Sequence, residues 1–193
     1  RGQTETAISI TPLNNEVSES AKTIRIDIID VSNGSEMGTQ QATLTLVDDE
    51  GAPSVRLLAV DSSFSEEEGS ARLRAVLSNA STQPVTVRLG FSGAATSGVD
   101  YQSETSNLII APGETQAEFS LIGRPDVIFE GAESLTVTIE SVVNGVAANQ
   151  RSASLAVLDN DFPPDVSLSP TFAQFSENNG SLSVRARLAA ASN

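Results

Sequence analysis

The chain of 193 residues contains neither cysteine nor histidine. Without cysteine, disulfides and thiolate metal sites cannot form, so a secreted protein of this kind must rely on its core or on bound ions for stability. Without histidine, the chain lacks the usual general base and the commonest transition-metal ligand. Its many serines therefore have no base with which to build the usual nucleophilic arrangement. These absences predict a protein that is not an enzyme.

Basic residues are scarce as well. Lysine and arginine together number 11 against 25 acidic residues, Lys22 is the single lysine, and the formal net charge is -14. Such a charge repels nucleic acids and anionic membranes and attracts cations. No apolar stretch approaches the roughly 20 residues of a membrane span, and no signal-peptide pattern is present. We expect a soluble fragment with no nucleic-acid partner and no direct membrane insertion, any targeting signal lying outside it.

Aromatic residues make up only 4% of the chain, but the apolar share of 39% is sufficient for packed cores. Apolar and polar residues alternate through residues 71–77, 85–91, 117–121 and 135–139, which is the pattern of half-buried strands. Shorter runs at 55–60, 108–110 and 155–158 bring the total to about seven strands, a number typical of a two-sheet sandwich. The predicted fold class is all-β, with antiparallel immunoglobulin-like sandwiches and no helix.

The chain repeats itself at a spacing of 111 residues, without insertion or deletion. The spacing relates Gly2 to Gly113, and Asp48 to Asp159. Further identical pairs are Glu19 and Glu130, Ile28 and Ile139, Asn33 and Asn144, Leu44 and Leu155, Val55 and Val166, Phe64 and Phe175, and Glu66 and Glu177. A fixed period of this length indicates tandem structural repeats.

The period divides the chain into three parts. Residues 1–51 are predicted to be the C-terminal half of a first repeat, 53–162 one complete repeat, and 164–193 the N-terminal strands of a third. Half-repeats expose unpaired edges and apolar faces unless something completes them. We therefore expect neighbouring repeats of a longer parent chain as partners or, as a variant, identical subunits that complete each other's sandwiches and form a filament.

Carboxylates gather in the loops near the predicted strand ends. Loops that follow alternate strands of a sandwich lie at the same end, so these groups are expected to converge there. Their mutual repulsion would raise some of their pKa values or require a cation. Oxygen ligands without histidine or cysteine favour Ca²⁺ over zinc. The carboxylates concerned are Glu66, Glu67, Glu68, Asp100, Asp126, Glu130, Glu133, Asp159 and Asp161.

Five short motifs occur in a fixed order. They are Phe64-Ser65-Glu66 with Gly69, Gly98-Val99-Asp100-Tyr101, Pro112-Gly113-Glu114-Thr115, Asp126-Val127-Ile128-Phe129-Glu130 with Glu133, and Leu158-Asp159-Asn160-Asp161. In this order the chain resembles, over essentially its whole length, the Calx-beta family of sodium/calcium exchangers, an integrin cytoplasmic segment and large bacterial surface proteins. The resemblance implies Ca²⁺ ligands at one end of the sandwich, near the junction with the next domain. It assigns carboxylates to Glu66, Asp100, Asp126, Glu130, Glu133, Asp159 and Asp161, and a backbone carbonyl to Ile128.

Three positions depart from the family pattern. Asn160 stands where another aspartate is common, so one ion is expected rather than two. In the first repeat, Asn15 and Lys22 replace the counterparts of Asp126 and Glu133, and a lysine ammonium at this place could substitute for an ion.

Simpler interpretations stand beside these. Glu67 and Glu68 are expected to be solvated surface groups, and Asp159 and Asp161 could serve only as turn formers. Phe64, Phe91, Phe119, Phe129 and Tyr101 are predicted to pack in the core.

Three functions remain open at this stage. The favoured one is a spacer repeat of a large extracellular bacterial adhesin or surface fibre, stiffened by Ca²⁺ at the domain junctions. The alternative is a calcium-sensing regulatory module attached to a membrane protein or transporter. Direct carbohydrate or protein binding by a loop face is the weakest, because no aromatic cluster supports it.

Overall fold

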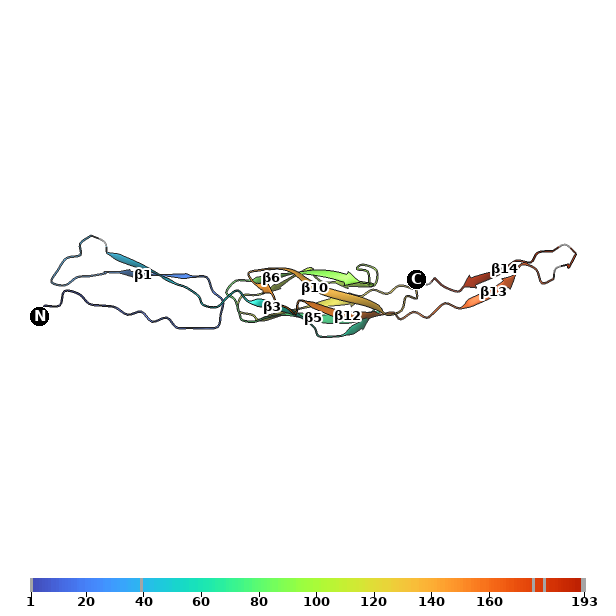
Figure 1. Ribbon diagram of the computed structural model, residues 1–193, viewed down its shortest axis with the longest axis horizontal. Helices are drawn as coiled ribbons and strands as arrows, with labels where there is room; N and C mark the ends of the chain where they lie inside the picture. The colour runs from blue at the N-terminus through green and yellow to red at the C-terminus, as the bar shows by residue number, and fades with distance from the viewer. Residues whose placement is uncertain (1, 39, 175, 179, 192–193) are drawn as a thin grey trace.

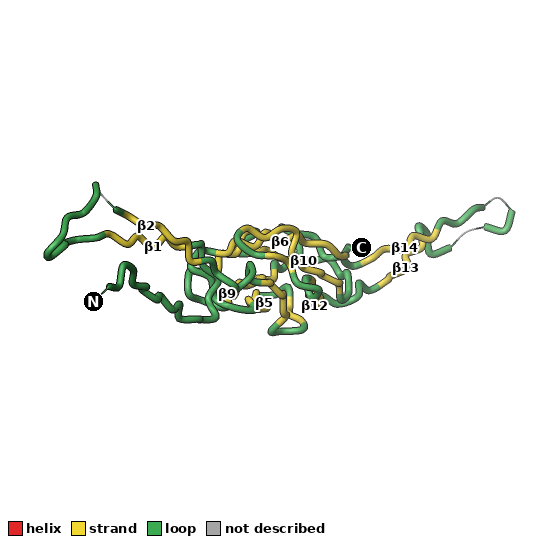
Figure 2. Tube along the Cα trace, turned by 60° about the vertical axis from the view of Figure 1, so that its left-hand side comes forward, coloured by secondary structure: helices red, strands yellow, loops and turns green. Residues whose placement is uncertain are grey.

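The computed structural model describes residues 2–38, 40–174, 176–178 and 180–191. The chain is elongated, with a central β-sandwich between two hairpins that extend in opposite directions (Figure 1). Strands and loops make up the whole of this described part, and no helix occurs in it (Figure 2). Consequently, none of its elements is a helix long and apolar enough to cross a membrane.

The central sandwich consists of two five-stranded sheets. In the first, the strand order is β4-β12-β10-β6-β8, and in the second it is β11-β3-β5-β9-β7. Most neighbours are antiparallel, but β4 pairs in parallel with β12, and β11 in parallel with β3. The first sheet contains β4 (Ser63–Ser65), β6 (Val85–Gly93), β8 (Asn107–Ile110), β10 (Glu133–Val143) and β12 (Ser152–Leu158). The second contains β3 (Ser54–Ala59), β5 (Ser70–Leu77), β7 (Tyr101–Ser103), β9 (Gln116–Gly123) and β11 (Val146–Ala147).

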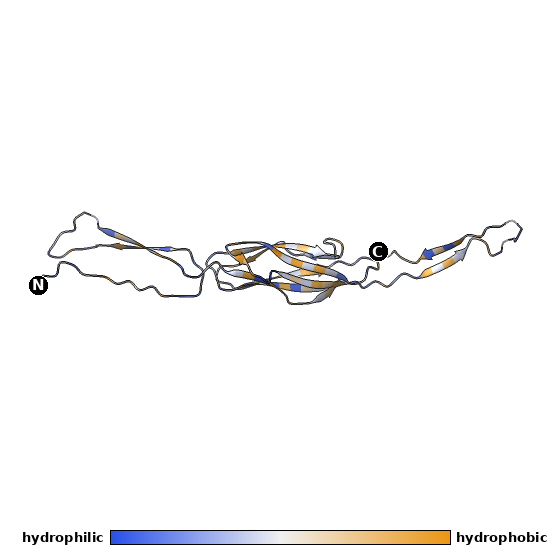
Figure 3. Cartoon of the chain, viewed as in Figure 1, coloured by the Kyte–Doolittle hydropathy of each residue, from blue (hydrophilic) through white to orange (hydrophobic). Residues whose placement is uncertain are grey.

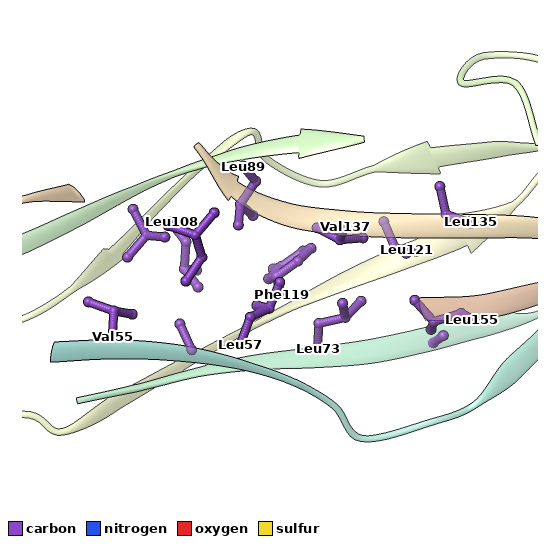
Figure 4. Close-up of a cluster of buried hydrophobic side chains, with 14 of the residues drawn as sticks. Val55, Leu57, Leu73, Leu89, Leu108, Phe119, Leu121, Leu135, Val137 and Leu155 are labelled. Atoms are coloured by element: carbon purple, nitrogen blue, oxygen red, sulfur yellow. The ribbon is translucent and has the colours of Figure 1, made fainter. Parts of the chain in front are cut away.

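The core lies between the two sheets and follows from the alternation in the sequence. In β5, Ala71, Leu73, Ala75 and Leu77 are buried while the intervening residues face outward. Phe119 of β9 reaches into the middle of this layer among leucines and valines of both sheets (Figure 4). Each buried branched side chain contributes roughly 1.5–3 kcal/mol, so this layer supplies most of the stability of the sandwich.

The all-β prediction is confirmed, and each of the seven predicted strands is present. The structure adds the short strands β4, β7 and β11, which the sequence pattern missed because two or three residues show no period. Of the predicted core aromatics, Phe64, Phe119 and Tyr101 are buried. Phe129 is only partly buried and lies outside the core, so its prediction was wrong. Phe91 packs against the core from a partly exposed position, with its ring centroid 6.3 Å from that of Tyr101.

The two flanking hairpins repeat the pairing of the sandwich. Strands β1 (Lys22–Asp27) and β2 (Gln41–Leu46) pair with Lys22 opposite Leu46, as β10 and β12 pair with Glu133 opposite Val157. Strands β13 (Val166–Pro170) and β14 (Val184–Leu188) pair with Val166 opposite Leu188, as β3 and β5 pair with Val55 opposite Leu77. Both hairpins therefore keep the 111-residue spacing, and the division at 1–51, 53–162 and 164–193 stays a prediction. Phe175, the counterpart of Phe64, and residues 192–193 of the third predicted repeat lie outside the described residues.

The hairpins carry apolar side chains that no second sheet covers within the described part of the chain. Leu168 is 71% exposed, whereas its counterpart Leu57 in the sandwich is fully buried. Hydrophobic residues are accordingly visible along both hairpins as well as inside the sandwich (Figure 3). Apolar side chains at equivalent positions of the repeat are thus buried in the sandwich and exposed in the hairpins.

Candidate metal centre

Acidic side chains from four separate loops meet at one end of the sandwich. Glu66 follows β4, Asp100 precedes β7, and Asp159 and Asp161 follow β12. The loop between β9 and β10 supplies the remaining predicted ligands, Asp126, Ile128 and Glu130, and Glu133 begins β10. Two groups have carboxylate oxygens that all lie within 4.8 Å of one another, namely Glu66, Asp126 and Asp161, and Glu66, Asp100 and Glu130. Glu66 belongs to both groups and is the centre of the cluster.

Asp159 organises the loop between β9 and β10. Its Oδ2 accepts hydrogen bonds from the N–H groups of Glu130, at 2.8 Å, and Gly131, at 2.7 Å. Its Oδ1 accepts a bond of 2.8 Å from the N–H of Asp161. Asp159 therefore fixes the backbone of the loop between β9 and β10 and of the loop that follows β12. Gly131 has a φ of 79°, a conformation that glycine adopts without strain.

Asp100 and Asp126 are fixed by short backbone turns. The N–H of Thr96 donates to Oδ2 of Asp100 at 2.6 Å, and the N–H of Ile128 donates to Oδ1 of Asp126 at 2.7 Å. The first bond leaves Oδ1 of Asp100 directed to the cluster without a partner. Loops held in this way present their carboxylates before any ion arrives.

Glu66 is buried because the backbone of its loop packs closely on β9. A side chain at Gly123 would collide with the carbonyl oxygen of Ser65 and with the backbone of Glu66. The N–H of Glu66 in turn donates to the carbonyl of Leu158, which ties the loop to the end of β12. Glycine at position 123 is thus a requirement for placing Glu66 in the cluster.

Four buried side-chain oxygens of the described residues lack a hydrogen-bond partner, and all four belong to this cluster. They are Oε1 of Glu66, Oδ1 of Asp100, Oε2 of Glu133 and Oδ2 of Asp161. An unpaired buried polar group costs about 1–3 kcal/mol, and more when it is charged. Oxygen donors of this kind, without nitrogen or sulfur, fit a hard cation such as Ca²⁺.

A comparison with protein families matches residues 48–161, more than half of the chain, to the Calx-beta domain. The chain belongs to the Calx-beta domain family. Three solved structures are similar in part: the apo form of the Calx CBD1 domain, CBD12 from CALX1.2, and the Calx CBD2 domain. No curated protein sequence matches the chain.

The three structural similarities are modest. CBD1 shares 22% identity over 55% of this chain and 98% of its own, with a TM-score of 0.47. CBD12 shares 23% over 55% of this chain and 44% of its own, also at 0.47, and CBD2 shares 15% over 57% and 91%, at 0.45. Membership of the Calx-beta family therefore rests on the family match.

The crowding of carboxylates in the Calx-beta domain shifts their proton affinities. Burial, with the charges of Asp159 and Asp126, raises the pKa of Glu66 to about 7. Burial and the neighbouring Asp100 raise the pKa of Glu133. Burial opposes ionisation of Asp159 too, but hydrogen bonds from backbone N–H groups, that of Gly131 first, hold its pKa below the ordinary value. The pKa of Asp159 is thus lowered and that of Glu66 raised, so Glu66 takes up a proton at a higher pH than a free glutamate does in the metal-free domain.

The raised pKa of Glu66 predicts that the metal-free domain loses stability as the pH rises from about 5 to about 8. Glutamate in the unfolded chain releases its proton near 4.5, and Glu66 in the fold near 7. The folded state binds more protons between these values, so the free energy of unfolding decreases with pH. Between pH 5 and pH 8 these two pKa values correspond to a loss of about 2 kcal/mol in the free energy of unfolding. Thermal unfolding in EDTA should therefore show a melting temperature lower at pH 8 than at pH 5 by about 10 °C, since 1 kcal/mol corresponds to roughly 4–8 °C.

Saturating Ca²⁺ should abolish this decrease, because the ion stabilises the deprotonated carboxylates. Glu66→Gln, which cannot titrate, serves as the control and should flatten most of the pH dependence in EDTA. A melting temperature that rises between pH 5 and 8 in EDTA would contradict the assignment.

The structure places every predicted ligand at this end of the sandwich, but in different roles. Glu66, Asp100, Asp126, Glu130 and Asp161 form the two groups described above. Glu133 lies beside Asp100, and the carbonyl of Ile128 stays a prediction. Of the residues predicted to be solvated, Glu67 is exposed but accepts a hydrogen bond of 3.0 Å from Asn160, and Glu68 is also exposed. Sequence reasoning missed Thr96 and Gly123, whose effects depend on contacts distant in sequence.

Proposed function

We propose that the central sandwich is a non-catalytic Ca²⁺-binding domain whose ion fills the acidic cluster around Glu66. The observation that carries this proposal is the convergence of all four unpartnered buried oxygens on one cluster. A divalent cation satisfies these oxygens and offsets the repulsion among the carboxylates at once.

The number of the oxygen ligands favours calcium among the hard cations. Calcium takes six to eight oxygens in a flexible geometry, whereas magnesium demands a near-ideal octahedron, keeps several waters and usually takes one or two carboxylates from a protein. The two groups around Glu66 together offer five carboxylates.

For the role of the bound ion, we favour a spacer repeat of an extracellular bacterial surface protein. The hairpins and the sandwich follow one another end to end (Figure 1). The metal cluster ends at Asp161, and only Phe162, Pro163, Pro164 and Asp165 separate it from β13. Proline restricts this short linker, and an ion held beside it would reduce bending between neighbouring repeats.

The proposal also names what covers the exposed faces of the hairpins. Neighbouring repeats would cover these faces, or identical subunits would do so in a filament.

The alternative role of the domain is a calcium-sensing regulatory module, as the family's exchanger members suggest. The two roles differ in affinity, because sensors bind at about 10⁻⁷–10⁻⁵ M and extracellular modules at about 10⁻⁴–10⁻³ M.

The test is thermal unfolding of the whole chain in EDTA, in Mg²⁺ and across a Ca²⁺ titration. We expect Ca²⁺ at about one hundred times its dissociation constant to add about 2.7 kcal/mol, which corresponds to roughly 10 °C or more. Mg²⁺ should produce a much smaller shift. A midpoint near millimolar Ca²⁺ supports the spacer, and a micromolar midpoint supports the sensor. No shift at millimolar Ca²⁺ would rule out the calcium function altogether.

A further inference from the structure

The loop that precedes β1 is hydrogen-bonded directly to the central sandwich. The N–H of Ser18 donates to the carbonyl of Ala80 at 2.9 Å, and the N–H of Thr82 donates to the carbonyl of Ser18 at 3.0 Å. Ser18 and Ser81 consequently form an isolated parallel bridge. This bridge links the first hairpin region to the sandwich outside the covalent linker 47–53.

The receiving loop is rigidly held within the sandwich. Ser81 is only 5% exposed. Its carbonyl accepts from the N–H of Gly113 at 2.9 Å, and its hydroxyl oxygen accepts from the N–H of Gln83 at 3.1 Å. Because these bonds fix the loop, it offers Ser18 a pair of backbone groups already in position.

The loop that contributes Ser18 has the same backbone construction as the metal-binding loop of the sandwich. The N–H of Glu19 donates to Oδ2 of Asp48 at 2.8 Å, as that of Glu130 does to Oδ2 of Asp159. The N–H of Val17 donates to Oδ1 of Asn15 at 2.7 Å, which repeats the turn made by Asp126.

The charges of the two loops differ. Lys22 stands at the position of Glu133, and its Nζ lies 2.6 Å from Oε2 of Glu19. At the six equivalent positions the sandwich has five carboxylates and one amide, whereas the first region has four carboxylates, one amide and one ammonium; the residues are Asp126, Glu130, Glu133, Asp159, Asn160 and Asp161, and Asn15, Glu19, Lys22, Asp48, Asp49 and Glu50. This loop therefore carries its own cation.

We propose that residues 17–19 and 80–82 form a metal-independent joint that holds the first hairpin region in a fixed orientation on the sandwich. The ammonium of Lys22 neutralises Glu19 next to the bridge, so the loop keeps its shape without Ca²⁺. The chain then contains two unlike junctions: a permanent one before the sandwich and an acidic one after it. This inference goes beyond the proposed function, because it requires no metal at the Glu66 cluster.

The test measures the distance between two spin labels on the whole chain. Since the chain has no cysteine, Thr43→Cys in β2 and Gln116→Cys in β9 give two unique, exposed attachment sites. We expect one narrow distance distribution that is the same in EDTA and in Ca²⁺. A distribution that is broad in EDTA and narrows only with Ca²⁺ would overturn the proposal, as would a broad one in both conditions.

Two variants separate the contributions to the joint. Ser18→Pro removes the N–H that donates to Ala80, and Lys22→Glu replaces the ammonium with a carboxylate, as at Glu133 in the sandwich. Each variant should increase the width of the distance distribution at least twofold in EDTA. Arg25→Glu makes the same charge change on β1, away from the bridge, and should leave the distribution narrow. A narrow distribution for Lys22→Glu would overturn the role of the ammonium. Glu66→Gln should leave the joint unchanged, which distinguishes failure of this proposal from failure of calcium binding.

Discussion

Replacing Glu66 with glutamine should abolish most of the Ca²⁺-dependent rise in melting temperature. Glu66 is 4% exposed and is the only residue that belongs to both groups of converging carboxylates among the described residues. The amide has nearly the shape of the carboxylate but no charge, so it removes an anionic ligand without opening a cavity. We expect the Ca²⁺ midpoint to rise at least 100-fold, and most of the roughly 10 °C stabilisation at one hundred times the dissociation constant of the unmodified chain to disappear.

The same variant should be more stable than the unmodified chain in EDTA near pH 8. There the unmodified Glu66 is forced to ionise beside Asp159 and Asp126, whereas glutamine is neutral. Glu68→Gln is the matched control, because Glu68 lies two residues further along the same loop with its side chain exposed. Both the melting temperature and the Ca²⁺ midpoint of this control should stay close to those of the unmodified chain. Equal losses of Ca²⁺ response in the two variants would show that only the overall charge of the loop matters.

Replacing Phe119 with alanine should lower the free energy of unfolding of the sandwich by about 3–5 kcal/mol. Phe119 is 3% exposed and lies between the sheets, next to Leu57 and Leu73 from the sheet to which it belongs and Val137 from the other (Figure 4). Its removal leaves a cavity that strands fixed by hydrogen bonds on both sides cannot close. Urea unfolding followed by far-ultraviolet circular dichroism measures the change.

Phe162→Ala is the matched control for the core substitution. Phe162 is 88% exposed, so the same loss of atoms should change the free energy of unfolding by less than about 0.5 kcal/mol. A loss of more than about 2 kcal/mol in this control would mean that Phe162 is covered in solution by another part of the chain or by a second molecule. A loss of less than about 1 kcal/mol for Phe119→Ala would contradict the packing described for the core.

The long strands of the sandwich could be predicted from the sequence because burial imposes a period of two. Leu73 and Ala75 in β5, or Leu135 and Val137 in β10, alternate with polar residues and are buried as expected. The short strands were not predictable in this way. Strand β4, for example, is defined by its parallel pairing with β12, and neither partner reveals the other locally.

The convergence of the acidic residues was predictable from the sequence, but the hydrogen bonds within the cluster were not. The order of the acidic motifs indicated which loops carry carboxylates, and sandwich topology brings these loops together. The sequence gives no sign that both oxygens of Asp159 accept backbone N–H groups. Nor does it indicate that the side-chain amide of Asn160 donates to Glu67. These hydrogen bonds depend on which backbone N–H groups lack partners, and this is determined only by the conformation of the folded loops.

The parallel pairing of β4 with β12 has a mechanical consequence. Strand β4 lies near the start of the sandwich and β12 at its end, and the flanking hairpins leave in opposite directions (Figure 1). Tension applied along the long axis therefore pulls these two strands past each other. The bridges of Phe64 with Val157 and of Ser65 with Leu158 are loaded together in shear and cannot open one after another. The Glu66 cluster begins one residue beyond this pair, so an ion bound there would fasten the two strands at the end where the force enters.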